Sequence, residues 1–264
     1  MDSFAGPRIE RLTFAFLLLV ADSVAQAPSP AVLHVGDLQV QGRTLKPYNN
    51  QWHVSLHKVD GTPLAEKAVW KDELRLLQKA GSEQLERTQT AVFTKDGLKV
   101  GETKTVNVCD RNTLAPISRY YSRHASVPGQ EEETQVEFHG RQVRFSQNKN
   151  GSNSTSTQEL LEPVFDFFGG MYGILLAALP LKRGFAGQLP SLDEDGPRLE
   201  WITFQVGDQE EVEAGQQSKL RAWVVNAATK QGPMKFWISP APPYIIKLEY
   251  TQNDAGLVWT FSMS

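Results

Sequence analysis

The sequence EPVFDFFGGMYGILLAALPLKRGFAGQLP, from Glu162 to Pro190, decides the fold because it is the most apolar stretch after the N-terminal region. Between Val164 and Leu179 the only charged residue is Asp166. Proline suits the first turn of a helix and cannot continue one, so Pro163 and Pro180 predict a helix over residues 164–179. Such a helix would be about 24 Å long. We call residues 164–179 the plug segment.

The predicted helix is apolar on every side, which is typical of a helix that the rest of a protein encloses. It is too short to cross a bilayer, which takes about 20 apolar residues, and its three glycines weaken it further. Most of the remaining chain has the alternation of β-strands. The sequence therefore predicts a mainly β protein, a strongly curved antiparallel sheet (half-barrel) of about ten or more strands, covered or plugged by the central apolar helix.

Several segments alternate apolar and polar residues with the period of two that marks a strand with one buried face. One of the clearest begins at Trp52, and Val54 and Leu56 continue its apolar side. Asp-Gly pairs at 60–61 and 96–97 predict hairpin turns between such segments. We therefore expect a meander of antiparallel strands on both sides of the plug segment.

Residues 147–157, QNKNGSNSTST, are wholly polar and predict a loop. Ser156 and Glu159 have the spacing of a helix-capping box, so we expect a short helical turn that leads into Pro163. No other stretch of this kind divides the chain. Residues 26–264 are therefore expected to form a single domain.

Residues 1–25 predict a secretory signal peptide. A weakly basic lead precedes an apolar run from Leu12 to Ala21, and small residues follow. We expect cleavage after Ala25, with a cut after Ala27 as the alternative. An uncleaved anchor is disfavoured because the apolar run is too short to span a bilayer. The sequence therefore predicts export.

The formal net charge of the 264 residues is −3, which favours neither a nucleic acid nor an anionic membrane surface as partner. Cys109 is the single cysteine, so no intramolecular disulfide can form and no cysteine lies at the cleavage site for lipid attachment. Its alternating surroundings favour a buried small side chain over a reactive thiol.

Aromatic and apolar side chains are the candidate ligand-binding residues. Four strands near the C-terminus carry one tryptophan each, and side chains of that size on one concave face either fill a core or line a pocket. The plug segment contributes the rest of the predicted interior lining. The candidates are Phe165, Phe168, Tyr172, Leu176, Trp201, Trp223, Trp237 and Trp259.

No catalytic motif, metal-ligand cluster or phosphate-binding loop is found, so we expect no enzyme, metal or cofactor, with a hydrolase as a minor alternative. His53 and His57 lie too far apart on a strand to share a metal ion. Asp166 would have a raised pKa if buried, but a carboxylate in the first turn of a helix is also a common dipole partner. Lys182 and Arg183 are either a solvated helix end or an anion site.

A series of motifs resembles a known pattern. They are TLKPYNNQWHV (44–54), AVWKDEL (68–74), LERTQT (85–90), DRNTLAPIS (110–118), LPLKRGF (179–185), VEAG (212–215) and WISPAPPYIIKLEY (237–250). In this order they resemble an uncharacterised family of exported bacterial proteins of unknown function, related to the half-barrel of the periplasmic lipoprotein-localisation carriers. The resemblance implies an open half-barrel with an apolar interior, in which the carriers hold acyl chains, and it implies no catalytic residues.

Two functions follow as expectations. The first is a soluble periplasmic protein that binds or carries a lipid or other hydrophobic, acyl-chain ligand. The alternative is a ligand-free structural or protein-interaction module of the cell envelope, with an envelope protein as partner. A carrier is expected to contain an apolar cavity of roughly 300 to 1,000 Å³, whereas an interaction module is expected to expose an apolar patch or an uncovered sheet edge.

Overall fold

The computed structural model describes residues 30–79, 81–127, 129–193, 198–215 and 218–264. The predicted signal peptide, residues 1–25, lies outside the described residues. No helix in the described part of the chain has the length and apolar character that a membrane crossing requires.

The described residues form one open sheet of 15 strands, as the sequence predicts for a mainly β half-barrel. The strands are β1 (Ala31–Val32), β2 (Tyr48–Lys58), β3 (Pro63–Lys79), β4 (Ser82–Lys95), β5 (Leu98–Asp110), β6 (Pro116–Ala125), β7 (Glu132–His139), β8 (Gln142–Lys149), β9 (Ser152–Glu159), β10 (Ala186–Leu192), β11 (Leu199–Ala214), β12 (Ser218–Thr229), β13 (Gly232–Ile238), β14 (Ile245–Gln252) and β15 (Leu257–Met263). Their order is β1-β10-β11-β12-β13-β14-β15-β2-β3-β4-β5-β6-β7-β8-β9. The β1–β10 pair is parallel and the other pairs are antiparallel.

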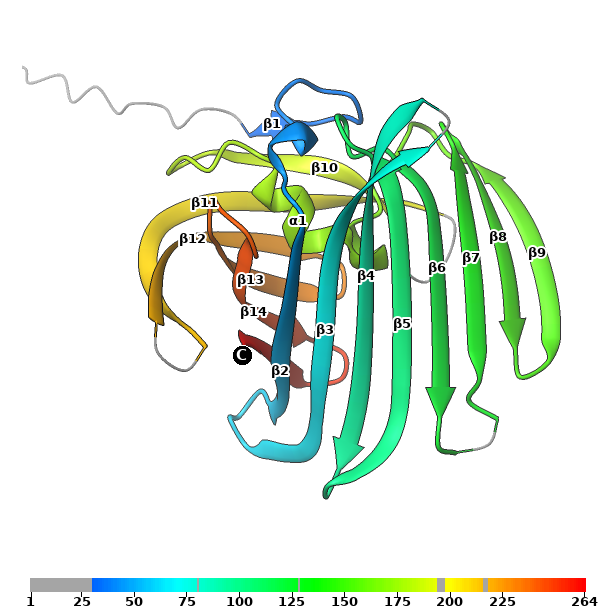
Figure 1. The fold of residues 1–264 in the computed structure, drawn as a ribbon, viewed down its shortest axis with the longest axis vertical. Helices are drawn as coiled ribbons and strands as arrows, with labels where there is room; N and C mark the ends of the chain where they lie inside the picture. The colour runs from blue at the N-terminus through cyan, green and yellow to red at the C-terminus, as the bar shows by residue number, and fades with distance from the viewer. Residues whose placement is uncertain (1–29, 80, 128, 194–197, 216–217) are drawn as a thin grey trace, which may run out of the picture.

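The sheet consists of two arms that meet where β15 pairs with β2. Strands β2 to β9 run upright in Figure 1, whereas β10 to β13 cross behind them at a steep angle. The plug segment lies in the hollow between the two arms, near one end of the upright strands. This curvature gives the sheet a concave inner face and a convex outer face.

The helix of the plug segment is shorter than predicted. A π-helix, η2 (Phe167–Met171), is followed by α1 (Tyr172–Ala177). Pro163 does not start it, because Phe165 instead bridges to Ser191 in the manner of a strand, and its N–H donates to the carbonyl of Pro190. Gly170, with φ of 118°, interrupts the helical backbone. The helix ends before Pro180, as predicted.

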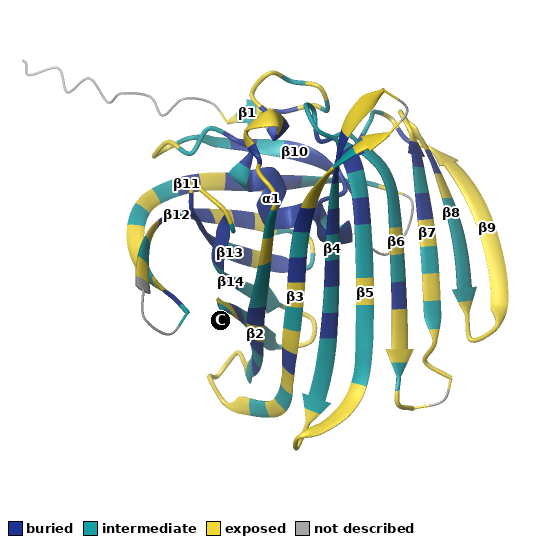
Figure 2. Ribbon diagram, viewed as in Figure 1, coloured by how far each residue is buried: buried dark blue, intermediate teal, exposed yellow. Residues whose placement is uncertain are grey.

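The predicted polar loop over 147–157 is wrong. Strands β8 and β9 form a hairpin there, with Asn150 and Gly151 at the turn, both at positive φ. The capping-box prediction fails with it, since Ser156 and Glu159 lie in β9. Every residue of β9 is exposed, as Figure 2 shows at the outer edge of the sheet. A strand with two wet faces lacks the apolar alternation by which strands are recognised.

The main core lies between the plug segment and the concave face of the sheet. Phe167, Ile174, Leu175 and Leu176 are almost completely buried there, together with apolar residues of both arms. A second cluster around Val136 and Val143 packs β7 and β8 against the chain just before η2. A short 3₁₀ helix, η1 (Gly42–Thr44), covers the end of the molecule that holds the plug segment.

Candidate functional site

The glycines of the plug segment allow it to lie directly against the sheet. A Cβ at Gly173 would stand 2.2 Å from Cδ1 of Ile245, and one at Gly170 would stand 2.5 Å from Oδ1 of Asn107. A Cβ at Gly169 would meet the side chains of Arg119 and Asp166. Close approach to neighbours, together with the positive φ of Gly170, explains why these three positions are glycine.

A buried ion pair holds the plug segment to β3 and β4. Nε and Nη2 of Arg87 donate to the two carboxylate oxygens of Asp72 at 2.8 and 2.6 Å, and both side chains are fully buried. Nη1 of Arg87 donates to the carbonyl of Gly170, and the hydroxyl of Tyr48 donates to Asp72. Burial alone would lower the pKa of Arg87, but Asp72, together with Tyr48 and Tyr172, raises it above the ordinary value. The guanidinium therefore stays charged.

A second buried group ties the start of η2 to β5 and β6. The carboxylate of Asp166 accepts from Nη1 of Arg119 at 2.8 Å and from Nδ2 of Asn107 at 2.9 Å. Burial raises the pKa of Asp166 above its ordinary value, and Arg119 and Asn107 offset part of that rise. Both interpretations of Asp166 hold in part: its carboxylate is buried with a raised pKa, and the backbone of Gly169 in η2 also hydrogen-bonds to it.

A third contact links β4 to α1. Nε2 of Gln89 donates to the hydroxyl of Tyr172 at 2.9 Å, and the guanidinium of Arg87 lies 5.0 Å from the centre of the Tyr172 ring. Polar side chains on three neighbouring strands thus bind the plug segment, and this end of the half-barrel is filled.

The opposite end of the upright strands contains a cavity of about 530 Å³. We call it the mouth cavity. Its lining residues come from β2 to β6, from the segment after β6 and from β15, and they are Leu56, Glu66, Lys67, Ala68, Phe93, Val100, Gly101, Glu102, Thr103, Tyr121, Arg123, His124, Ala125, Val127, Gln130 and Trp259. The volume lies within the range of about 300 to 1,000 Å³ that is usual for small-molecule sites.

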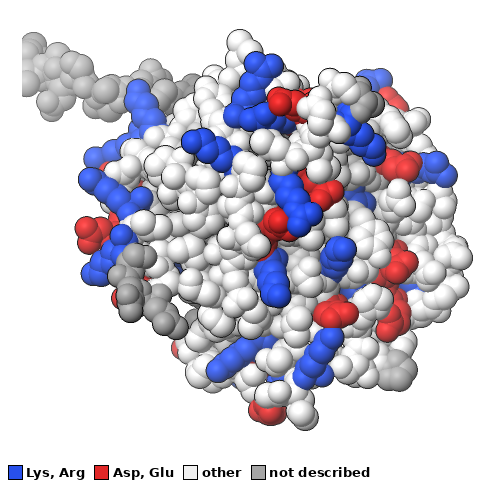
Figure 3. Space-filling model, viewed as in Figure 1, with Lys and Arg blue, Asp and Glu red and all other residues white. Residues whose placement is uncertain are grey.

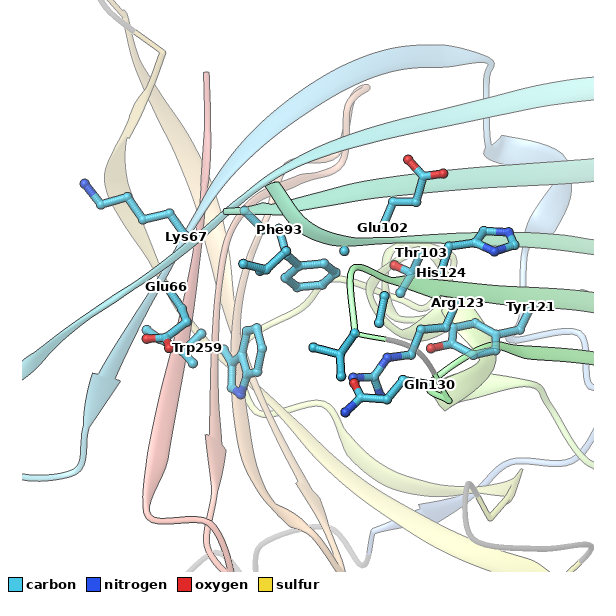
Figure 4. Close-up of a pocket in the computed structure, with 16 residues that line it drawn as sticks. Glu66, Lys67, Phe93, Glu102, Thr103, Tyr121, Arg123, His124, Gln130 and Trp259 are labelled. Atoms are coloured by element: carbon cyan, nitrogen blue, oxygen red, sulfur yellow. The ribbon is translucent and has the colours of Figure 1, made fainter. Parts of the chain in front are cut away.

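Sheet register explains how distant segments build the apolar wall of the mouth cavity. Trp259 lies opposite Leu56, Ala68 opposite Phe93, and Gly101 opposite both Phe93 and Ala125. Figure 4 shows Phe93 and Trp259 on one side of the cavity, with Arg123 and Gln130 reaching toward them from the other. The cavity therefore has an aromatic wall and a polar wall.

Charged residues at the rim of the mouth cavity are mostly paired. Glu66 binds Lys95 at 2.8 Å, Glu102 binds Lys99 at 2.5 Å and His124 binds Glu131 at 2.6 Å. In Figure 4 the side chains of Lys67, Glu102 and His124 point away from the cavity. Figure 3 shows that positive and negative side chains are interspersed over the visible face of the molecule, consistent with the small net charge.

The predicted lining residues are found at several places. Phe165, Tyr172 and Leu176 are buried in the main core, and Phe168 packs against it half-buried. Trp223 and Trp259 are half-buried at the main core, and Trp259 also lines the mouth cavity. Trp237 belongs to a separate cluster and donates its indole N–H to Glu210 at 2.7 Å, while Trp201 lies edge-on to His34. The structure therefore does not bring the four tryptophans to one face.

Other candidate residues have local partners. Arg183 forms an exposed ion pair with Asp208 at 3.1 Å and lies beyond the end of α1 at Ala177, so it is solvated but does not complement the helix end. Nε2 of His57 lies 3.2 Å from Oγ of Ser55. Cys109 is buried as predicted, and burial raises the pKa of its thiol.

Sequence reasoning missed Arg87, Asp72 and the mouth cavity. The signal for Arg87 is its position in the alternation of β4. It lies on the same side of the strand as Leu85, Gln89 and Ala91, and that side is buried. A charged residue in the apolar phase of a strand needs a buried partner. The sequence carries no comparable signal for the mouth cavity. Its apolar wall forms only when β15 pairs with β2, and these two strands are far apart in the sequence.

The open, strongly curved sheet with a plug segment on its concave face defines a β-barrel-like class of protein. A crystal structure of a β-barrel-like protein of domain of unknown function DUF1849 from Brucella abortus is similar, with a TM-score of 0.54 at 12% sequence identity. The similarity covers 83% of this chain and 96% of that one, and it concerns the fold alone.

The sequence matches the family model "Protein of unknown function (DUF3108)" over residues 73–256, and the chain belongs to this family. The expected membership of an uncharacterised family with a barrel-like fold is thereby confirmed. The relation to the lipoprotein-localisation carriers stays a prediction. No curated protein matches the sequence.

Proposed function

We propose that this protein binds a small hydrophobic or amphipathic molecule, such as a lipid or another acyl-chain compound, in the mouth cavity. The observation that carries the proposal is the cavity of about 530 Å³ with its wall of Leu56, Ala68, Phe93 and Trp259. Concave sites with apolar walls and a few polar groups are the usual form of ligand sites. A structural module without a ligand is expected to have an interior filled by side chains. The interior is filled in this way at the end that holds the plug segment, but not at the mouth cavity.

Binding fits the interior better than catalysis does. The buried titratable groups Asp72, Arg87, Asp166 and Arg119 are paired with one another and hold the plug segment. A catalytic site needs titratable groups that converge on an accessible cleft. We therefore propose a binding protein rather than an enzyme.

The proposal is tested by titrating the purified and delipidated protein with a fluorescent fatty acid. Ala125→Phe places a large ring in the cavity and should weaken binding about tenfold or more, because the ring displaces the ligand. The matched control is Tyr120→Phe on the outer face of the same strand, where affinity should not change. The proposal is wrong if the wild-type protein binds no such ligand at micromolar concentrations while it is folded.

Export is proposed on the sequence of residues 1–25 alone. A soluble periplasmic protein that binds an apolar compound can move it through an aqueous compartment. N-terminal sequencing of the protein from its producing cell should find a start near Gln26. An intact Met1 on a cytoplasmic product would contradict export.

A second candidate function rests on β9. Among the described strands it is the edge of the sheet and pairs with β8 only, and it is exposed at all eight positions. An uncovered edge offers backbone N–H and C=O groups to a strand of another protein. An envelope protein that adds such a strand is therefore the alternative partner.

The edge is tested with a photo-crosslinking side chain at Ser154 in the producing cell. A specific adduct from Ser154, absent when the same group replaces Tyr120, would support strand addition. Thr155→Pro should abolish the adduct, because in the alternation from the Asn150-Gly151 turn the N–H of Thr155 faces the open edge, and proline has no N–H to donate. Equal crosslinking from both positions would contradict it.

A further inference from the structure

The concave face of β4 and β6 carries three arginines with different surroundings. Arg87 and Arg119 are paired with Asp72 and Asp166, as described above. Arg123 lies four residues after Arg119 on the same face of β6, and it lines the mouth cavity. Among the described residues, no hydrogen bond or ion pair engages its guanidinium.

Among the described residues, the carboxylates near Arg123 are bonded to other side chains. Glu132 lies directly opposite it in the register of β6 and β7, but Oε1 of Glu132 accepts from Nε2 of Gln147 at 2.8 Å. Glu66 and Glu102 at the rim are bound by Lys95 and Lys99. The polar wall of the cavity therefore presents a guanidinium to which no carboxylate of the described residues is bonded.

The opposite wall supplies the apolar half of a recognition site. Leu56 and Ala68 are buried beside the rings of Phe93 and Trp259, and Figure 4 places both rings across from Arg123. A cation that faces an aromatic and aliphatic wall can bind a molecule with an anionic head and an apolar chain. Arginine suits a carboxylate or a phosphate because its planar fork donates two parallel hydrogen bonds.

We infer that the ligand of the mouth cavity is an anionic amphiphile, whose carboxylate or phosphate head binds Arg123 and whose chain lies against Phe93 and Trp259. This inference rests on the proposed function and specifies its ligand. Because Arg123 is exposed at the open end of the cavity, the head group lies at the surface and the chain points inward. Salt screens such a contact, so its contribution to affinity falls as ionic strength rises.

The test compares three ligands with one chain length: dodecanoate, dodecyl phosphate and dodecanol. Affinities are measured by isothermal titration calorimetry at low salt. The wild-type protein should bind one or both anions about tenfold more tightly than dodecanol, the effect of a hydrogen bond to a charged group. Arg123→Gln should weaken binding of the anions about tenfold more than binding of dodecanol, and so remove that preference.

The matched control is Lys104→Gln, which removes the same charge from the neighbouring strand β5. Lys104 is exposed and lies opposite Ser122, one residue out of phase with the cavity-lining Thr103 and Arg123. It should retain the preference for anions. A loss of preference in Lys104→Gln equal to that in Arg123→Gln would mean that net charge, not the site, selects the ligand.

The outcomes separate the inference from the proposed function. If no dodecyl compound binds the folded protein, both are wrong. If dodecanol binds as tightly as the anions, or if Arg123→Gln weakens all three ligands equally, the proposed function stands and the inference is wrong. A preference for dodecyl phosphate over dodecanoate, or the reverse, identifies which head group the site takes.

Discussion

At the scale of single residues, Arg87 is the side chain on which the interior depends most. It is fully buried, binds both oxygens of Asp72, and donates to the carbonyl of Gly170 in the plug segment. Removing one member of a buried ion pair leaves the other charge without compensation, whereas replacing both with apolar residues is often tolerated.

Arg87→Met should therefore lower the free energy of unfolding by about 3 to 5 kcal/mol. The double variant Asp72→Leu with Arg87→Met should recover a large part of that loss. Urea denaturation followed by tryptophan fluorescence measures both. A single variant as stable as the wild type would show that the pair does not hold the plug segment.

Asp166 predicts a pH dependence of stability with a defined sign. Its folded-state pKa is raised above the ordinary value of 3.8, so the folded state binds the proton more tightly than the unfolded state does. The free energy of unfolding should fall as the pH rises from 3.8 through the folded-state pKa, and level off above it.

The measurement compares the wild type with Asp166→Asn, which has no titrating group at this position. The stability of the wild type relative to the variant should decrease between pH 3.5 and pH 7, conditions that bracket the ordinary pKa. A relative stability that increases over this interval would mean that Arg119 and Asn107 outweigh the effect of burial.

At the scale of elements, the plug segment is built so that its two adjacent phenylalanines differ in burial. Phe167 has no exposed surface and stands edge-on to Phe168, Tyr172 and Phe236, whereas Phe168 is half-buried. Removing a buried Phe side chain leaves a cavity in addition to the lost transfer energy.

Phe167→Ala should thus lower the free energy of unfolding by about 3 to 5 kcal/mol, and Phe168→Ala by clearly less. Chemical denaturation of the two variants under identical conditions decides the order. Equal losses, or a larger loss for Phe168→Ala, would mean that the segment is seated differently against the sheet.

The plug segment also shows where sequence reasoning succeeds and where it stops. Its apolar composition and Pro180 were enough to predict a buried helix that ends near that residue. The strand-like path of Phe165 could not be predicted, because it depends on Ser191, a partner on β10. Likewise, β9 consists of polar residues that resemble a loop, and the Asn150-Gly151 turn was the sole local signal for its hairpin.

At the scale of the whole molecule, stability should be unevenly distributed along the sheet. Strands β3, β4 and β5 are long and border the main core, whereas β9 is exposed on both faces and lies at the edge. Regions with few buried apolar contacts open at low free energy.

Native-state hydrogen exchange should therefore be fastest in the β8–β9 hairpin and slowest in the middle of β4 and β5. The exchange of individual amides, read by mass spectrometry of peptides, tests this order. Strong protection of Ser152–Glu159 in the isolated protein would indicate that another strand covers the edge.

The pairing of β15 with β2 has a consequence for the order in which the protein is assembled during synthesis. Leu257 pairs with Lys58, 199 positions earlier in the chain (257 minus 58), whereas the hairpins on either side join strands that are neighbours in sequence. Contacts between distant segments form late because closing a long loop costs entropy. Each arm can form its own hairpins as it is translated, but the arms cannot be joined until β15 has left the ribosome. The complete half-barrel, with its concave face closed on both sides of the plug segment, therefore forms only when synthesis of the strands is finished.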